Sequence, residues 1–245
     1  MKSSSSSVSR ARPLLGTLVE IRISADCADP AVAIGEAFST VERVHQLMSA
    51  QDPESDVSRI NRAADATALR IDPWTSQVLA RAKAIHAATE GLFDCAVAAQ
   101  VCAQGSSITL DGIAKGYAVD RAVESLRASG VPWGVVNAGG DLRLFGERAH
   151  TVHVRDPRSP GEFLRLGPLC EVAVASSAAY FENSALVDPR RRKICEPVCG
   201  VTVIANDCAT ADALTKPCLL EPNRAHEFAR ALDAHAMVIR LESRP

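Results

Sequence analysis

The stretch that decides the fold is ITLDGIAKGYAVD, residues 108–120. An extended apolar segment turns into a helix here, with Gly112, Lys115 and Gly116 at the junction. The start of a helix offers free backbone N–H groups and the positive end of the helix dipole, which suits a phosphate group. Glycine lets a ligand approach the backbone closely, and lysine adds a mobile cation. The segment therefore indicates a phosphate site, unless its glycines serve packing alone.

Outward from this segment, strand and helix patterns alternate. Residues 17–23 alternate apolar and polar side chains, as a half-buried strand does. Asp29-Pro30 supplies an N-cap and a first-turn proline for a helix, and Thr75 can cap a second helix that ends near Gly91. The helix that starts in 108–120 stops at Gly130. Its inward face carries Ala118, Val119, Ala122, Val123 and Leu126.

The second half of the chain is mostly strand. Residues 131–137 and 141–145 form two strands joined by a turn at 138–140. Further elements are expected as strands at 151–155, 172–176, 201–205 and 236–241 and as helices at 208–216 and 225–234. The pattern predicts a mixed arrangement of strands and helices without internal repeats.

Composition excludes several classes of protein. The 245 residues are 47% hydrophobic and 23% charged, with a formal net charge of −2. This balance is typical of a soluble globular protein and gives no electrostatic footprint for nucleic acid. No apolar run reaches the length of a membrane span, so no stable membrane insertion is expected.

The ends of the chain and its cysteines suggest the compartment. The start lacks the apolar region of a secretory signal, so residues 1–12 are expected to form a flexible polar tail. Eight cysteines occur without a C-x-x-C pair, which favours reduced thiols over a disulfide framework or a structural zinc. These features predict a cytoplasmic protein.

Three further clusters could carry chemistry. Asn137-Ala-Gly-Gly-Asp141 is either a simple hairpin turn or part of the same cleft as residues 108–120. The basic residues 190–193 form either a solvated loop or a surface for phosphate or protein. Asp212 and Thr215 lie three apart on a predicted helix, so their oxygens can face one side. That pair suits Mg²⁺, although Asp212 could instead serve only the helix dipole.

The order of these motifs resembles the ApbE family of FAD:protein FMN transferases. The matching segments are 112–121 and 136–142, together with 15–17, 48–49, 58–61, 91–94, 187–190 and 211–214. The resemblance implies one α+β domain over residues 13–245, related to the T-fold, with mixed or antiparallel sheets packed by helices. It implies an enzyme that cleaves the FAD pyrophosphate, attaches FMN to a threonine or serine hydroxyl of a target protein and releases AMP.

The resemblance also implies roles for individual residues. Mg²⁺ would be held by the Gly112 carbonyl, Asp212 and Thr215, and the catalytic residues would be Asp212 and Lys115. The FAD-binding residues would be Met48, Leu92, Phe93, Asp94, Asp111, Lys115, Asn137, Gly139, Gly140, Asp141, Val187 and Asp188.

Four positions differ from the usual family pattern. Lys216 stands four residues after Asp212, where a threonine is usual, and Ala185 stands where a histidine is common. Thr109 and Asp111 replace an aspartate and a glycine, and the segment 95–108 is shorter than usual. Two alternatives to the transferase therefore stay open, an FAD pyrophosphatase that yields FMN and AMP, and a non-catalytic FAD-binding protein.

Overall fold

The computed structural model describes residues 6–65, 68–102, 108–178 and 186–241, so Ala185 lies outside the described residues. Its centre is a sheet of seven strands within that described part of the chain. The strands are β1 (Ser7–Leu14), β2 (Thr17–Ser24), β3 (Gly134–Ala138), β4 (Asp141–Phe145), β7 (Ala173–Ser177), β10 (Cys199–Ala205) and β11 (His235–Arg240). They lie in the order β1-β2-β3-β4-β7-β10-β11, and every neighbouring pair is antiparallel.

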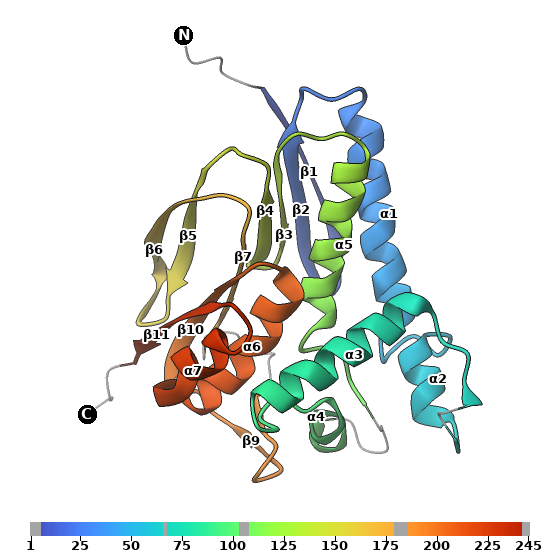
Figure 1. Ribbon diagram of the computed structural model, residues 1–245, viewed down its shortest axis with the longest axis vertical. Helices are drawn as coiled ribbons and strands as arrows, with labels where there is room; N and C mark the ends of the chain where they lie inside the picture. The colour runs from blue at the N-terminus through green and yellow to red at the C-terminus, as the bar shows by residue number, and fades with distance from the viewer. Residues whose placement is uncertain (1–5, 66–67, 103–107, 179–185, 242–245) are drawn as a thin grey trace.

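Helices cover one face of this sheet (Figure 1). The covering helices are α1 (Pro30–Met48), α5 (Ala114–Ala128), α6 (Cys208–Leu220) and α7 (Ala225–Arg230). α5 packs on β3 and β4, and α6 packs on β7 and β10. The shorter or more peripheral helices are α2 (Asp56–Arg62), α3 (Pro73–Ala88), α4 (Cys95–Cys102) and the 3-10 helix η2 (Pro222–Arg224). α2, α3 and α4 gather near the start of α5 (Figure 1).

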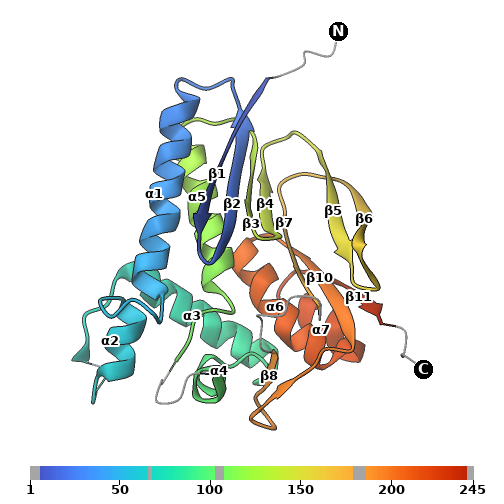
Figure 2. The ribbon, with the colours of Figure 1, turned by 180° about the vertical axis from the view of Figure 1, so that it is seen from behind.

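A two-stranded ribbon covers part of the opposite face (Figure 2). It consists of β5 (His150–Asp156) and β6 (Ser159–Leu169). In β7, Ala173 and Ala175 face the helices, whereas Val174 packs with Val152 and Val154 of the ribbon. Successive side chains of a strand point to opposite faces, so this one strand contributes to both hydrophobic cores. A second small ribbon joins β8 (Leu186–Asp188) and β9 (Lys193–Cys195).

Most predicted elements are confirmed. The protein is a single α+β domain with a mostly antiparallel sheet. Asp29 caps α1 by accepting from the backbone N–H groups of Ala31 and Val32. α5 buries the predicted apolar face, and Gly139-Gly140 forms the predicted turn between β3 and β4.

The expected polar tail over residues 1–12 is wrong from Ser7 onward. Residues Ser7–Leu14 form β1, which pairs along its length with β2 through a two-residue turn at Leu15-Gly16. Both turn residues have positive φ, as the hairpin turn requires. β1 is an edge strand whose side chains are mostly exposed, so its polar composition gave no strand signal.

One other local prediction, the cap of α3, needs correction. Asp72 rather than Thr75 caps α3, and the Thr75 hydroxyl instead donates to Asp56 at 2.8 Å. In the segment before α5, the backbone of Ile108 hydrogen-bonds with a side chain, that of Asn61, at 2.8 and 3.0 Å. The strand β6 was not predicted, because it includes Pro160 and Gly161 and no clear alternation.

Candidate active site

The charged centre of the candidate site comes from α5, α6 and β4. Asp212 on α6 is buried, with 1% of its surface exposed. The Lys216 Nζ, one turn further along α6, lies 2.5 Å from Asp212 Oδ1. The Lys115 Nζ, in the first turn of α5, lies 3.6 Å from Asp212 Oδ2 and forms an ion pair with Asp141 at the start of β4. These four residues are called the lysine–aspartate cluster below.

Close packing between α5 and α6 places Asp212. A Cβ atom on Gly116 would overlap the carbonyl group of Cys208 and lie 2.8 Å from the backbone nitrogen of Ala209. At this approach the Gly116 N–H donates to Asp212 Oδ2 at 3.2 Å. Gly116 is therefore needed for the close packing of the two helices. Its N–H group, which the sequence predicted as a donor to phosphate, donates to the Asp212 carboxylate.

A second carboxylate fixes the same helix pair from the other side. Asp120 on α5 accepts from the backbone N–H groups of Cys208 and Ala209 at 2.8 and 2.9 Å. The Arg143 guanidinium donates to Asp120 at 2.7 Å. Asp120 thus stabilises the first turn of α6, beside the cap that Asp207 gives to that helix.

Burial and neighbouring charges act in opposite directions on these groups. Burial by itself raises the pKa of Asp212, but the Lys115 and Lys216 ammonium groups hold that pKa below its ordinary value. Burial lowers the pKa of Lys115, while Asp212 opposes this effect. At Asp120, burial outweighs the favourable Arg143 charge and raises the pKa to about 6.

The residues expected to hold Mg²⁺ do not fit a divalent cation as they stand. The Thr215 hydroxyl donates to the Asp212 backbone carbonyl at 2.7 Å and accepts from the Ser177 hydroxyl at 3.1 Å. The Lys216 ammonium contacts both Asp212 Oδ1 and that same carbonyl, the latter at 3.1 Å. An ammonium group therefore takes the oxygens that a metal would need.

Gly112 connects this cluster to the segment before α4. A Cβ atom on Gly112 would lie 3.2 Å from Phe93 Cε2 and 3.8 Å from Lys216 Cε. Phe93, Gly112 and Lys216 are thus neighbours. Leu92 and Met48 are both 3% exposed and belong to the main hydrophobic core.

Two predicted FAD-binding aspartates cap local turns. Asp94 accepts from two backbone N–H groups at the start of α4, both at 2.8 Å. Asp188, at the end of β8, accepts from the N–H groups of the next turn at 2.9 and 3.2 Å. Val187 is half-buried beside it, and Asp111 is exposed. β8 packs against both α4 and α6, so it links the segment around Asp94 to the helix that carries Asp212.

The glycine pair at the β3–β4 turn forms a hairpin, as one of the two interpretations predicted. Gly139 and Gly140 have φ values of +64° and +104°, and the Gly140 N–H donates to the Asn137 side chain at 2.9 Å. Of this motif, Asp141 is the residue that reaches the lysine–aspartate cluster. The turn therefore contributes to the site through the residue that follows it.

The basic residues after β8 lie on an exposed loop with local partners. Arg190 forms an ion pair with Glu221, and Arg191 Nε lies 3.5 Å from Asp188 Oδ2. The Arg191 side chain is 77% exposed. This arrangement agrees with a solvated loop.

Sequence patterns indicated no functional role for two residues that lie at the site, Lys216 and Ser177. Lys216 was noted only as a departure, although its spacing of four from Asp212 on a helix predicts contact between them. Ser177, at the end of β7, carries no local signal because its partner Thr215 lies 38 residues away.

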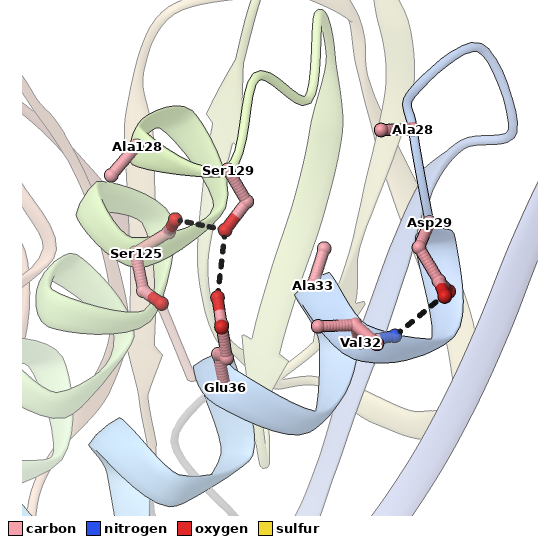
Figure 3. A pocket seen from close by; sticks show the side chains of 8 residues that line it. All are labelled: Ala28, Asp29, Val32, Ala33, Glu36, Ser125, Ala128 and Ser129. Carbon is pink, nitrogen blue, oxygen red and sulfur yellow. Dashed lines mark hydrogen bonds between the residues drawn. The ribbon is translucent and has the colours of Figure 1, made fainter.

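A hollow elsewhere on the molecule lies between the start of α1 and the end of α5 (Figure 3). Its lining residues are Ala28, Asp29, Val32, Ala33, Glu36, Ser125, Ala128 and Ser129. Asp29 caps α1 there, and Glu36 accepts from the Ser129 hydroxyl at 3.0 Å. None of the predicted site residues lines this hollow, so it is separate from the candidate site.

The fold matches solved structures of flavin transferases over nearly its full length. The Pseudomonas stutzeri flavinyl transferase ApbE aligns with a TM-score of 0.84 and 20% identity, covering 98% of this chain and 93% of that one. The ApbE protein of Thermotoga maritima aligns with a TM-score of 0.82 and 23% identity, covering 97% of each chain. The arrangement of sheet and helices is therefore that of the ApbE flavin transferases.

Sequence comparison assigns the family. Residues 15–107 and 100–239 match the ApbE family. A Vibrio cholerae FAD:protein FMN transferase is 25% identical over 82% of this chain and 78% of that protein. A Rhodobacter capsulatus protein of the same name is 25% identical over 82% of this chain and 49% of its own length. The chain belongs to the ApbE family.

Within residues 6–65, 68–102, 108–178 and 186–241, every helix is too short or too polar to cross a bilayer.

Proposed function

We propose that this protein is an FAD:protein FMN transferase. Family membership supports the class of reaction, and the lysine–aspartate cluster is the observation that supports it at the level of residues. The side chains of Lys115 and Lys216 are 29% and 31% exposed, and both ammonium groups lie beside the buried Asp212 carboxylate. A diphosphate is the ligand that such a pair of ammonium groups would attract.

The proposed reaction is a phosphoryl transfer. A threonine or serine hydroxyl of a target protein attacks the phosphorus on the FMN side of the FAD pyrophosphate. A new P–O bond joins FMN to the hydroxyl oxygen, the bond to the bridging oxygen breaks, AMP departs with that oxygen, and the hydroxyl proton is released. Such transfers depend mainly on positioning and on neutralisation of developing charge.

Lys115 and Asp212 have distinct roles in this proposal. Lys115 contacts the pyrophosphate and neutralises charge as AMP departs. Asp212, the other residue that the family pattern implies as catalytic, positions Lys115 and Lys216 at the reacting groups. The Mg²⁺ implied by the family resemblance has no step here, because Lys216 takes the oxygens of the expected ligand Asp212.

The rest of the proposed FAD site follows the family positions. It comprises Met48, Leu92, Phe93, Asp94, Asp111, Asn137, Gly139, Gly140, Asp141, Val187 and Asp188. The packing of Phe93 against Gly112 and of β8 against α6 supports this grouping for the segments around residues 93 and 187.

The proposal is tested with purified protein, FAD and a flavin-accepting protein domain. Transfer adds the mass of FMN to the acceptor, with one AMP released for each acceptor labelled. FMN and AMP without labelling would identify a pyrophosphatase, and FAD binding without either product would identify a binding protein. Each of these two results would contradict the proposal that the protein is an FMN transferase.

The variant Asp212→Ala tests the site in the same assay. We expect AMP release to fall by at least about 100-fold, because the two lysines lose the charge that positions them. Asp26→Ala, in the loop between β2 and α1, is the control and should release AMP at the parent rate. Unchanged turnover in Asp212→Ala would place the active site elsewhere.

A further inference from the structure

The position of the Lys216 ammonium has a consequence for the cation requirement of the site. Lys216 Nζ lies 2.5 Å from Asp212 Oδ1 and 3.1 Å from the Asp212 backbone carbonyl oxygen. A carboxylate and a carbonyl oxygen are the ligand types that Mg²⁺ prefers in proteins. The ammonium group therefore sits where a divalent cation would bind this residue.

The remaining oxygen of Asp212 is also in use. Asp212 Oδ2 accepts from the Gly116 N–H at 3.2 Å and lies 3.6 Å from Lys115 Nζ. The Thr215 hydroxyl directs its hydrogen to the Asp212 carbonyl. A metal that approached Asp212 would have to displace Lys216 first.

The charges of the lysine–aspartate cluster are already balanced. Asp141 and Asp212 carry two negative charges, and Lys115 and Lys216 carry two positive charges. In the protein without FAD, a divalent cation beside Asp212 would add two positive charges that no carboxylate of the cluster balances. The cation would repel the Lys115 and Lys216 ammonium groups, and this repulsion is strong because Asp212 is buried, where water screens charge poorly. Within the described residues, no group of three or more His, Cys, Asp or Glu side chains is placed to hold a metal.

We propose that Lys216 is a built-in cation that replaces a divalent metal beside Asp212, so that this site binds a dinucleotide diphosphate without metal. The identity of the ligand as a dinucleotide diphosphate rests on the proposed function. The exclusion of a metal does not, because it rests on the contacts and charges of the lysine–aspartate cluster. Lys115 and Lys216 would contact the diphosphate as charged hydrogen-bond donors, while Asp141 and Asp212 hold them in place.

Direct cation binding tests the exclusion of metal. Mn²⁺ binding is measured by electron paramagnetic resonance on the parent protein, on Lys216→Thr and on the double variant Lys216→Thr/Asp212→Asn. We expect Lys216→Thr to bind one Mn²⁺ at least about ten-fold more tightly than the parent, and the double variant to lose that site. Lys83→Thr, which removes an exposed lysine of α3, should behave as the parent does.

FAD binding gives a second readout that needs no turnover. Flavin fluorescence is titrated with the parent and with Lys216→Thr, in EDTA and in Mg²⁺. The parent's affinity should change by less than about two-fold between the two conditions, whereas Lys216→Thr should bind about ten-fold more weakly in EDTA and recover in Mg²⁺.

The outcomes separate this inference from the proposed function. A parent protein that binds one Mn²⁺ through Asp212, shown by loss in Asp212→Asn, overturns the inference. An FAD affinity of the parent that depends on Mg²⁺ overturns it as well. Exclusion of Mn²⁺ together with absence of FAD binding would support the built-in cation and contradict the proposed function. The FAD titrations of the parent in EDTA and in Mg²⁺ decide the question even if a variant fails to fold.

Discussion

Asp120 and Asp212 each belong to one helix and accept hydrogen bonds from the first turn of the other. Asp120 on α5 accepts from the N–H groups of Cys208 and Ala209, and Asp212 on α6 accepts from the N–H group of Gly116. The two helix starts therefore meet through reciprocal carboxylates. Only a residue without a side chain fits between them, because a Cβ on Gly116 would overlap the Cys208 carbonyl. The candidate site is built directly on this junction.

Asp120 should make stability depend on pH. Its pKa is raised to about 6 by burial, above the ordinary value of 3.8, so the folded state binds this proton more tightly than the unfolded state does. The stability that Asp120 contributes is fully present below about pH 4 and is lost as the pH rises through about 6. Because one pKa unit corresponds to about 1.4 kcal/mol, the loss is about 2–3 kcal/mol by pH 7.

Urea unfolding of the parent and of Asp120→Asn at pH 4, 5, 6 and 7 measures this effect. The free energy of unfolding of the parent minus that of the variant should fall by about 2–3 kcal/mol from pH 4 to pH 7. The exposed substitution Glu54→Gln provides the control, with a difference that lacks this fall. A difference for Asp120→Asn that stays flat or rises with pH contradicts the raised pKa.

Gly116→Ala should destabilise the protein by about 3 kcal/mol, since overpacking must separate α5 from α6. The matched control is Gly35→Ala in α1, where a Cβ would meet nothing within 4 Å. There we expect a gain of about 0.5–1 kcal/mol, because alanine is the better helix former. Thermal and urea unfolding should show opposite signs for the same chemical change. Equal effects at both positions would mean that the helix junction tolerates a methyl group.

Local signals in the sequence predicted most elements of the fold. Asp29-Pro30 marked the start of α1 correctly, and the same pair at Asp72-Pro73 begins α3. Thr75 was predicted to cap this helix, but its hydroxyl donates to Asp56 instead. An aspartate followed by proline therefore predicts the start of both helices, and Thr75 lies inside α3.

Contacts between distant residues could not be predicted in the same way. Asp212 and Gly116 are 96 residues apart, and Asp120 and Cys208 are 88 apart. The family resemblance grouped Lys115, Asp141 and Asp212, although no periodicity links α5, β4 and α6. The edge strand β1 was missed for a different reason, since its partner β2 supplies hydrogen bonds that side-chain patterns do not reveal.

Lys115→Met should weaken FAD binding by about ten-fold, because the ammonium group that faces the diphosphate is lost while the apolar stem is kept. Flavin fluorescence titration measures the dissociation constant, and circular dichroism verifies that the variant is folded. Lys83→Met removes an exposed lysine from α3 and should leave the dissociation constant unchanged. Parent-like affinity in folded Lys115→Met would exclude this lysine from the nucleotide site.

Asn61 on α2 should determine the order of the segment that leads into α5. Its side-chain amide donates to the Ile108 carbonyl at 3.0 Å and accepts from the Ile108 N–H at 2.8 Å, in place of a neighbouring strand. Asn61→Ala leaves both half-buried backbone groups without this partner, so we expect a loss of about 1–3 kcal/mol in unfolding free energy. Hydrogen exchange should become faster at Ile108 while the amides of α1 stay protected. Asn223→Ala removes an exposed amide that contacts Arg240 and should cost less than about 0.5 kcal/mol. If Ile108 exchanges at the parent rate in Asn61→Ala, other contacts hold this segment and the Asn61 amide is dispensable.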